Sequence, residues 1–545
     1  MPPPLQDSAT EVLPSQSAGP RDRVRWRPGL LLRFFAAVAV MTSPIALAAG
    51  AVTATVVNID TTSPSPLPAG FSGFNVPQLR NGVEYFDPKF VAAAASLRPG
   101  WLRFPAGTAS LAFDWQAGHV NTGWLDYLTL SSPPLVGSGT ASILHKAQQL
   151  TQAKGGVYFS DFATFANTFG SPVIVCFNGY TDTDPSSATQ MALAAQSYGL
   201  NVEEWELSNE PYLYPLIFPT ASAYAASMFS PYFSDIVSVT PAANVGLFSA
   251  GLFPGVKINN SLWDTALSAY SPRYWNASSV HIYPIERTFT PQQTWEKLNG
   301  ILAHGTADYI NSYLLPLIGP QTPVYITEFN CCTQDSNPYL SYVYNGVFLA
   351  EYIARMSSVP NVKAVGINSL YTDNYDAHGL VQSVDDFESY LMAQVAANPN
   401  YSTNTATDPN TQFQFYISAP GLAVAVANQA VNGSSQLWPT TMTGGATVPI
   451  LGYDGNPVPA IYAQAYLGNN GNHYLLITNK ANQALPVRIQ VNGVSVTSKL
   501  TLTYVSNSDG QAANSAQSPN NVQIQTAVSG NPVTVGPNSV TCVTW

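Results

Sequence analysis

The stretch of sequence that decides the fold is Val202-Glu203-Glu204-Trp205-Glu206-Leu207-Ser208-Asn209-Glu210-Pro211. Its first six residues form a strand-like run, and Pro211 stops the strand because proline cannot donate to a β ladder. A second strand-like run, Pro323-Val324-Tyr325-Ile326-Thr327, is followed at once by Glu328. Asn209, Glu210 and Glu328 are therefore predicted to lie at the C-terminal ends of two strands.

Similar runs recur through the middle of the chain, each followed by a helix-like segment. They lie at residues 71–76, 101–104, 172–177, 202–207, 245–250, 278–283, 323–327 and 364–370. This alternation is typical of parallel strands joined by helical crossovers, and eight repeats are the number in a (β/α)₈ barrel. We therefore predict an α/β fold with Glu210 after the fourth barrel strand and Glu328 after the seventh.

Crossover helices are predicted between these runs, at residues 88–97, 159–168, 188–198, 221–237 and 340–356, with a last one at 413–431. Two long insertions remain, at 114–156 after the second strand and at 372–412 after the eighth. Barrel enzymes build their sites at the C-terminal ends of the strands, where the second insertion is expected to lie. It is a candidate lid or specificity loop.

From Gly433 onward, short alternating runs separated by turn residues predict an antiparallel β-sandwich. The runs lie at 460–467, 474–478, 487–491, 499–505, 522–526 and 540–545, and the polar stretch 506–521 is a predicted loop. The N-terminal run 51–59 also alternates and is expected to pair into that sheet. The expected organisation is a secretory signal at 1–48, an N-terminal strand segment at 49–64 joining the β-sandwich, a catalytic barrel at 65–432 and a β-sandwich domain at 433–545.

The N-terminus has the pattern of a secretory signal. Four arginines between positions 21 and 27 precede an apolar stretch at 30–41, and Ala46-Leu47-Ala48 offers a cleavage site. The alternative is an uncleaved membrane anchor. No later segment approaches the ~20 consecutive apolar residues of a membrane span. We expect a secreted protein, extracellular or periplasmic, without membrane contact once the signal is removed.

Composition restricts the partners. With 545 residues, 46 % of them hydrophobic, the chain can bury more than one core. Only 9 % of the residues are charged and the net charge is -11, which argues against nucleic acid. The four cysteines cannot form a disulfide framework, although the adjacent Cys331 and Cys332 are either free thiols or a vicinal disulfide. We expect a monomer that uses neither metal nor cofactor.

Two carboxylates at the ends of parallel strands are what hydrolysis of a glycosidic bond requires, one to protonate the leaving oxygen and one to attack the anomeric carbon. The plainer interpretation of Glu210 is a carboxylate that satisfies backbone donors at a helix N-terminus. A structural Glu328 would need its own cation, and no Lys or Arg is nearby in the sequence. The neighbours Glu203, Glu204 and Glu206 fall below the barrel mouth and are expected to be structural. Glu286 replaces Glu328 only if the strand count is wrong.

Other polar residues close the remaining strands. Tyr283 and Arg103 are suited to keep a nucleophilic carboxylate ionised through hydrogen bonds, while a general acid needs a raised pKa. Asn178 closes the third strand and is a candidate sugar ligand. Arg103 is equally consistent with an ion pair inside the barrel, and a core histidine is the favoured interpretation of His281.

The chain resembles the retaining glycoside hydrolases of clan A, and family 79, which contains β-glucuronidases and heparanase, in particular. The resemblance rests on Leu102-Arg103-Phe104-Pro105-Ala106-Gly107-Thr108, Glu206-Leu207-Ser208-Asn209-Glu210-Pro211, His281-Ile282-Tyr283-Pro284 and Thr327-Glu328-Phe329. It implies that Glu210 is the acid/base, that Asn209 binds the sugar 2-hydroxyl, that Glu328 forms the glycosyl-enzyme and that Tyr283 holds Glu328. The substrate would be an oligosaccharide or glycoconjugate.

The resemblance also places the specificity loop at Cys331-Cys332-Thr333-Gln334-Asp335-Ser336, where Gln334 would contact the sugar. This loop lacks the tyrosine expected for a uronic carboxylate, and Asp335 repels a carboxylate unless it points away. Tyr371 or Tyr375 can supply a donor instead. A neutral, methyl-esterified or otherwise substituted sugar stays open beside glucuronic acid, and the scarcity of Lys and Arg favours exo action over cleavage of long sulfated chains.

A different class of function also fits the sequence. A secreted carbohydrate-binding or adhesive protein on a decayed barrel would use exposed aromatic residues such as Trp115, Trp124 and Tyr180. It predicts binding that survives loss of both carboxylates, whereas a retaining β-glycosidase predicts carboxyls about 5 Å apart and loss of turnover.

Overall fold

The computed structural model describes residues 53–76, 85–153, 156–251, 260–285, 289–332, 337–372, 377–383 and 414–545. The predicted signal at 1–48 lies outside these residues, as do Glu286, Gln334, Asp335, Tyr375 and most of the 372–412 insertion. No helix among the described residues is both long and apolar enough to cross a membrane.

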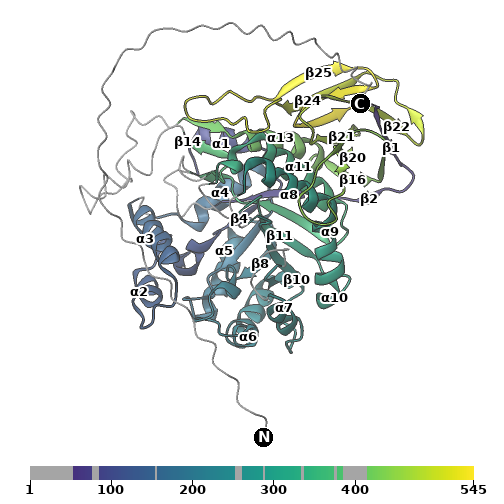
Figure 1. Cartoon of the computed structure of the whole chain (residues 1–545). Coiled ribbons are helices and arrows are strands. Elements are labelled where there is room, and N and C mark those ends of the chain that lie inside the picture. Colours follow the sequence, from purple (N-terminus) through teal and green to yellow (C-terminus); the bar gives the residue numbers. More distant parts are fainter. Residues whose placement is uncertain are drawn as a thin grey trace, which may run out of the picture. The chain divides into compact units, whose positions relative to one another are not determined.

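Eight parallel strands close into a barrel in the order β10-β11-β12-β3-β4-β7-β8-β9 (Figure 1). Their bounds are β3 Ser72–Asn75, β4 Leu102–Phe104, β7 Val173–Phe177, β8 Val202–Leu207, β9 Val245–Ser249, β10 Ala277–Ile282, β11 Val324–Phe329 and β12 Val362–Ile367. Each of the eight predicted runs overlaps one of these strands, so the barrel prediction is confirmed. Glu328 lies inside β11, one residue before its end.

Helices surround the barrel and cover its outward-facing apolar side chains. They are α1 Pro88–Ser96, α4 Phe159–Phe169, α5 Pro185–Ser197, α6 Ala221–Val239, α7 Asn260–Ser268, α8 Pro291–His304, α9 Thr306–Asp308, η3 Tyr309–Leu314, α10 Leu315–Ile318, α11 Val343–Ser357 and α13 Ala419–Val431. The prediction of one helix over 413–431 is wrong at its start. Phe415–Ile417 is strand β15, and the helix begins only after Ser418, whose hydroxyl accepts from the Gly421 amide. Pro420 is tolerated because it occupies the first turn.

The insertion after the second barrel strand has its own structure. It contains η1 Thr108–Ala112, β5 Phe113–Asp114, β6 His119–Val120, α2 Thr122–Leu130 and α3 Ser138–Ala153. After the eighth barrel strand, β13 Tyr371–Thr372, β14 Val381–Ser383 and β15 form a small sheet. Two further 3₁₀ turns, η2 Pro211–Leu213 and η4 Pro338–Ser341, follow the strands that carry Glu210 and Glu328.

The C-terminal region consists of two main sheets around a second apolar core. One sheet has the order β17-β1-β22-β23, with β26 pairing β22, and the other has the order β2-β16-β20-β21-β27-β24-β25. The bounds are β1 Thr55–Ile59, β2 Ser65–Pro66, β16 Ser434–Trp438, β17 Thr440–Thr443, β18 Thr447–Val448, β19 Val458–Pro459, β20 Ile461–Gly468, β21 His473–Asn479, β22 Leu485–Val491, β23 Val494–Ser495, β24 Leu500–Ser506, β25 Gln525–Ser529, β26 Val533–Val535 and β27 Ser539–Thr544. Buried Val57, Val487 and Val543 show that both sheets contribute to that core.

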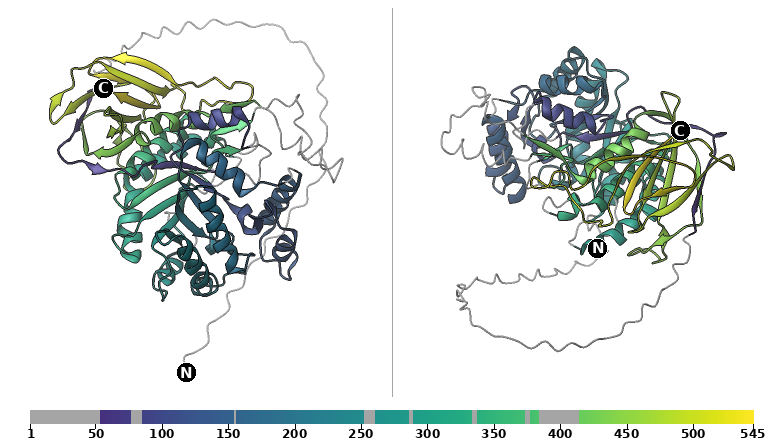
Figure 2. Two further views of the ribbon diagram at one scale, coloured as in Figure 1. Left: turned by 180° about the vertical axis from the view of Figure 1, so that it is seen from behind. Right: turned by 90° about the horizontal axis from the view of Figure 1, so that it is seen from above.

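The N-terminal strand completes the first of these sheets, as predicted. β1 lies between β22, which it pairs in parallel, and β17, which it pairs antiparallel. Figures 1 and 2 show this purple strand beside the yellow strands from the end of the chain. The pairing is long-range, since Val57 faces Ile489 and Met442.

The bottom of the barrel is closed by an apolar layer. Trp101, Ile174, Ala277, Tyr325 and Ala364 form a buried cluster there. The Trp101 ring fills the space where side chains of Gly73 and Gly366 would be, since a Cβ at either glycine would lie within 2.4 Å of that residue.

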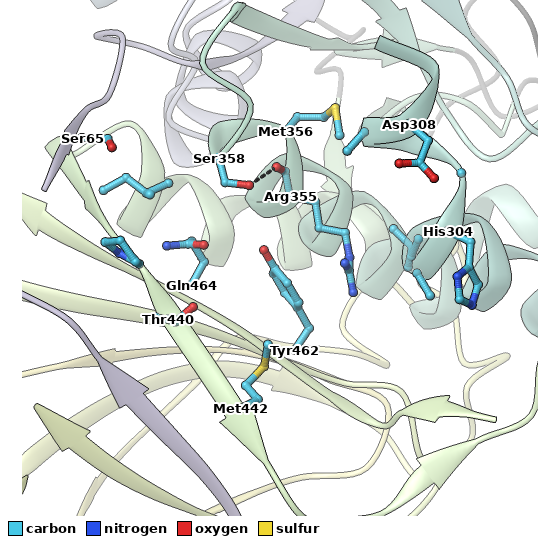
Figure 3. Close-up of a pocket in the computed structure, with 16 residues that line it drawn as sticks. Ser65, His304, Asp308, Arg355, Met356, Ser358, Thr440, Met442, Tyr462 and Gln464 are labelled. Atoms are coloured by element: carbon cyan, nitrogen blue, oxygen red, sulfur yellow. Dashed lines mark hydrogen bonds between the residues drawn. The ribbon is translucent and has the colours of Figure 1, made fainter. Parts of the chain in front are cut away.

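A buried ion cluster joins α11 to the C-terminal β-sheet region, which we call the second region. Glu351, fully buried, accepts from Lys480 Nζ at 2.8 and 3.0 Å, from Arg355 Nη2 at 2.8 Å and from the Thr478 hydroxyl at 2.7 Å. Burial opposes ionisation, but Lys480 and Arg355 hold the pKa of Glu351 below its ordinary value. Beside the cluster is a cavity of about 500 Å³ in which Arg355 lies over the Tyr462 ring, 4.2 Å from its centroid (Figure 3).

Candidate active site

The turn after β8 presents Asn209 and Glu210 in an uncommon backbone conformation. Ser208 and Glu210 both have positive φ, 74° and 53°, although neither is glycine. Such left-handed conformations cost energy and persist where the surrounding structure enforces them. Two buried groups enforce this one, because Ser208 N donates to Phe177 O and the Tyr180 hydroxyl donates to Asn209 O.

Glu328 is held by two direct hydrogen bonds at the barrel mouth. Arg103 Nη1 donates to Oε1 at 2.6 Å, and the Tyr283 hydroxyl donates to Oε2 at 2.7 Å. Burial alone would raise the pKa of Glu328, but the nearby His281, Arg103 and the Tyr283 hydroxyl hold it below the ordinary value. Glu328 is therefore an ionised carboxylate with both oxygens oriented.

Tyr283 itself remains a donor. Burial and the charge of Glu328 raise the pKa of its hydroxyl well above the usual range. Asn368 Nδ2 donates to the same hydroxyl oxygen at 2.8 Å, which fixes the direction of the phenolic proton toward Glu328. This geometry matches the predicted role of Tyr283 in holding Glu328.

Arg103 is fully buried and connects β8 and β11 from below the two carboxylates. Besides Glu328, its guanidinium donates to Glu206 Oε2 at 2.6 Å, to Asn75 Oδ1 at 3.0 Å and to Asn209 Oδ1 at 2.9 Å. All three of its nitrogens are thus engaged within the barrel. The prediction that Arg103 binds substrate is wrong, and its alternative, an ion pair inside the barrel, is correct.

His281 is buried, as predicted for a core histidine, and it also lies between the two carboxylates. Its Nδ1 is 3.0 Å from Glu210 Oε1 and 3.5 Å from Glu328 Oε2. These two oxygens are therefore no more than about 6.5 Å apart, the sum of both distances and the lower end of the range for inverting glycosidases. In the sequence, only the closeness of His281 to Tyr283 could have indicated that His281 contacts the two carboxylates.

Glu210 has a different environment from Glu328. Its side chain is 18 % exposed, no ion pair joins it to an arginine or lysine within the described part of the chain, and it accepts from the Tyr212 hydroxyl at 3.1 Å. The Asn209 amide lies 3.5 Å from its other oxygen. Glu328 is thus held by hydrogen-bond donors from Arg103 and Tyr283, while Glu210 is accessible to solvent.

Of the remaining carboxylates of β8, which are predicted to be structural, Glu204 and Glu206 are buried inside the barrel. Glu206 pairs with Arg103, and Glu204 accepts from the Ser279 hydroxyl at 2.9 Å. Burial, reinforced by repulsion from Glu206, raises the pKa of Glu204 well above its ordinary value. Glu203, by contrast, is exposed.

Two predicted sugar ligands are used elsewhere. The Asn178 amide donates to Phe113 O and the Thr181 hydroxyl, and its oxygen accepts from the Tyr180 and Thr181 amides, so it organises its own loop. Tyr371 is fully buried, with its ring against Phe90 and Phe415. Both predictions are corrected accordingly, and Gln334 lies outside the described residues.

The three aromatic residues named for a carbohydrate-binding surface are not fully exposed. Tyr180 is buried, and Trp115 and Trp124 are partly buried against the main core. Cys331 and Cys332 are buried free thiols whose sulfurs lie 3.7 Å apart. Among the described residues, no group of three or more His, Cys, Asp or Glu side chains is placed to hold a metal ion.

No protein-family model matches this sequence, and neither does any curated protein. Solved structures match over 90 % of the chain. An α-L-arabinofuranosidase of Thermotoga maritima, in complex with arabinose, matches over its whole length with a TM-score of 0.63 and 15 % identity. A 4-O-α-L-rhamnosyl-β-D-glucuronidase of Fusarium oxysporum 12S matches over 100 % of its length with a TM-score of 0.55 and 14 % identity. A family 44 xyloglucanase of Paenibacillus polymyxa matches over 99 % with a TM-score of 0.52 and 12 % identity. At these identities the likeness establishes the fold.

Three residues that build the site were not singled out from the sequence, and a fourth, Glu206, was predicted only to be structural. Tyr212 donates to Glu210, and Asn368 donates to Tyr283. Asn75 and Glu206 both accept from Arg103. Asn75 and Asn368 stand at the ends of the first and eighth strands, so their position was a usable signal. Tyr212 and Glu206 gave none beyond their closeness to Glu210.

Proposed function

We propose that the protein is a retaining β-glycoside hydrolase with Glu328 as nucleophile and Glu210 as acid/base. The observation that carries this proposal is the contact of both carboxylates with one histidine nitrogen, at 3.0 and 3.5 Å, in unlike surroundings. A nucleophile must be ionised and oriented, whereas a proton donor must reach the leaving oxygen and exchange its proton. The fold shared with glycosidases of known structure supports the proposal.

In the first step, Glu328 attacks the anomeric carbon while Glu210 gives its proton to the glycosidic oxygen. The bond between that carbon and oxygen breaks, the aglycone leaves as an alcohol, and a glycosyl ester of Glu328 forms. In the second step, ionised Glu210 takes a proton from water, and the resulting hydroxyl attacks the anomeric carbon and releases Glu328. Asn209, fixed by Arg103, binds the hydroxyl next to the anomeric carbon.

For the glycone we propose a β-glucuronide, with family 79-like specificity and exo action. The four sequence elements of the resemblance support this, as does the likeness in fold to a rhamnosyl-glucuronidase. The second candidate is a neutral sugar, favoured by the likeness to arabinofuranosidases and by the commitment of Arg103 to Glu328 and Glu206. We propose that the enzyme acts outside the cell as a monomer, after removal of residues 1–48.

A panel of chromogenic glycosides tests both levels of the proposal. Purified protein and its Glu328→Gln variant are incubated with the β-glucuronide, β-glucoside, β-galactoside, β-xyloside and α-L-arabinofuranoside of one phenol at mildly acid pH. Release abolished in the variant supports the mechanism, and the sugar that reacts names the glycone. Release unaffected by Glu328→Gln would refute the assignment, and binding of sugars without any turnover would favour the carbohydrate-binding alternative.

A further inference from the structure

An apolar, solvent-exposed surface follows the acid/base residue directly. Leu213 is 42 % exposed and Leu216 is 56 % exposed, and Pro215 between them is exposed as well. Isolated exposed leucines need no explanation. Here three apolar side chains gather within four residues, and the sequence contains no charged residue from Pro211 to Ser234. We call Leu213, Pro215 and Leu216 the apolar rim.

The apolar rim is held in place by buried anchors rather than left loose. Tyr214 and Phe218 are buried, and each ring lies 5.3 Å from the Tyr180 ring. The amides of Ile217 and Phe218 both donate to Tyr214 O, at 3.0 and 2.9 Å. Because the anchors fix the loop, a ligand would meet a surface that needs little ordering.

Its position relative to Glu210 tells which part of the substrate it meets. The Leu213 amide donates to Glu210 O at 3.0 Å, so the apolar rim begins one tight turn beyond the acid/base. A general acid must lie within hydrogen-bond distance of the oxygen it protonates. That oxygen belongs to the leaving group, so the atoms next to it, the aglycone, emerge beside Glu210.

We propose that the apolar rim is an aglycone subsite and that the preferred substrates carry an apolar alkyl or aryl aglycone. This inference rests on the proposed function and deepens it. Leu213 and Leu216 bury the apolar aglycone as it departs from the anomeric carbon. A polar or charged leaving sugar gains nothing from that contact.

The test uses two aryl glycosides of the sugar that the chromogenic panel identifies. One phenol carries a para-butyl chain and the other a para-hydroxypropyl chain of similar length, which keeps the basicity of the leaving oxygen nearly equal. Burial of one methylene is worth about fourfold in an equilibrium or rate ratio. We expect kcat/KM for the butyl compound to exceed that for the hydroxypropyl compound by roughly tenfold or more.

The variants are Leu213→Ser, Leu216→Ser and the double change, with Val494→Ser as the control. Val494 is 71 % exposed and belongs to β23 in the second region. We expect the double variant to lose most of the butyl preference while keeping kcat/KM for the hydroxypropyl compound within about twofold, and the control to change neither. Calorimetric binding of the butyl glycoside to the Glu328→Gln form should weaken in parallel.

The failures of the two proposals are distinguishable. Turnover without a butyl preference, or a preference that survives the double change, overturns the aglycone subsite and leaves the hydrolase intact. Absence of turnover together with absence of butyl glycoside binding overturns both. A variant that unfolds would be recognised by its melting temperature, and the single substitutions then decide.

Discussion

Glu328 and Glu351 are both buried carboxylates with cationic neighbours, yet they differ in how completely they are satisfied. Glu351 accepts from Lys480, Arg355 and Thr478, with several donors on each oxygen. Glu328 accepts one direct hydrogen bond on each oxygen, from Arg103 and Tyr283, and is 5 % exposed. Both are kept ionised, but Glu328 has fewer donors on its oxygens and shares His281 with a second carboxylate, Glu210. An ion pair alone therefore does not identify a reactive group.

The difference between Glu328 and Glu351 is tested most directly by the same substitution at both sites. Glu328→Gln should reduce kcat on the order of 10⁴-fold or more, because the attacking oxygen is replaced by an amide. Glu351→Gln should leave kcat of the folded protein within a few-fold but cost about 3–5 kcal/mol of stability, since Lys480 remains buried without its partner. Turnover numbers and urea midpoints of the two variants show whether one loses activity and the other loses stability. Equal losses of activity in both would contradict it.

Glu210→Gln tests the other carboxylate of the pair. A positioned general acid contributes about 10²- to 10⁴-fold, so hydrolysis of an alkyl glycoside should fall by that amount. A glycoside with a strongly acidic phenol needs little protonation and should lose much less in the first step. A Brønsted plot over several phenols, steeper in the variant than in the parent, is the expected measurement. An unchanged slope would exclude Glu210 as the acid.

Tyr283→Phe removes one of the two direct hydrogen bonds to Glu328. A bond to a charged group is worth about 1.5–3 kcal/mol, so kcat/KM should fall by roughly ten- to 150-fold. The pKa of Glu328 is lowered in the folded protein, so Glu328 stays ionised to a lower pH than in the unfolded chain. The stability that the ionised carboxylate contributes to the fold is fully present above the unfolded pKa of about 4.3 and is lost as the pH falls through the folded pKa. The acid limb of the pH profile should lie below about 4.3 in the parent and move upward in the variant. A limb that stays in place would show that Tyr283 does not tune Glu328.

The smallest effect is expected at the edge of the junction cluster. Arg355 is 26 % exposed, and Glu351 keeps Lys480 and Thr478 when Arg355 is removed. Arg355→Met should therefore cost only about 1 kcal/mol, far less than Lys480→Met, which strands a fully buried carboxylate. Urea unfolding of both variants gives the comparison. An equal cost would mean that the exposed arginine is the principal counter-charge.

The barrel could be predicted because its strands are short apolar runs between helices, a pattern carried by neighbouring residues. The two carboxylates could be predicted because Asn209, Glu210 and Glu328 stand where two of these runs end. Arg103, Asn178 and Tyr371 were assigned to the sugar for the same reason, which proved insufficient. The position of a residue at a strand end does not tell whether the side chain points into the barrel, as in Arg103, or into its own loop, as in Asn178.

The ion cluster of Glu351, Lys480 and Arg355 was not predicted at all. Glu351 and Arg355 are one helical turn apart, but Lys480 comes from a distant strand end, and such a pairing leaves no local pattern. The contact of His281 with Glu210 was missed for the same reason, because the two residues are 71 positions apart in the sequence. Contacts that form only when the barrel closes cannot be predicted from the periodicity of the sequence.

The position of β1 has a consequence for synthesis. Thr55–Ile59 pairs with Thr440–Thr443 and with Leu485–Val491, which leave the ribosome roughly 380 to 430 residues later. At about 5–20 residues per second, this strand waits for its partners for roughly 20 s or longer with its hydrogen-bonding edges unpaired. The first strand made thus depends on some of the last strands, and a nascent chain that lacks β22 leaves one edge of β1 unpaired.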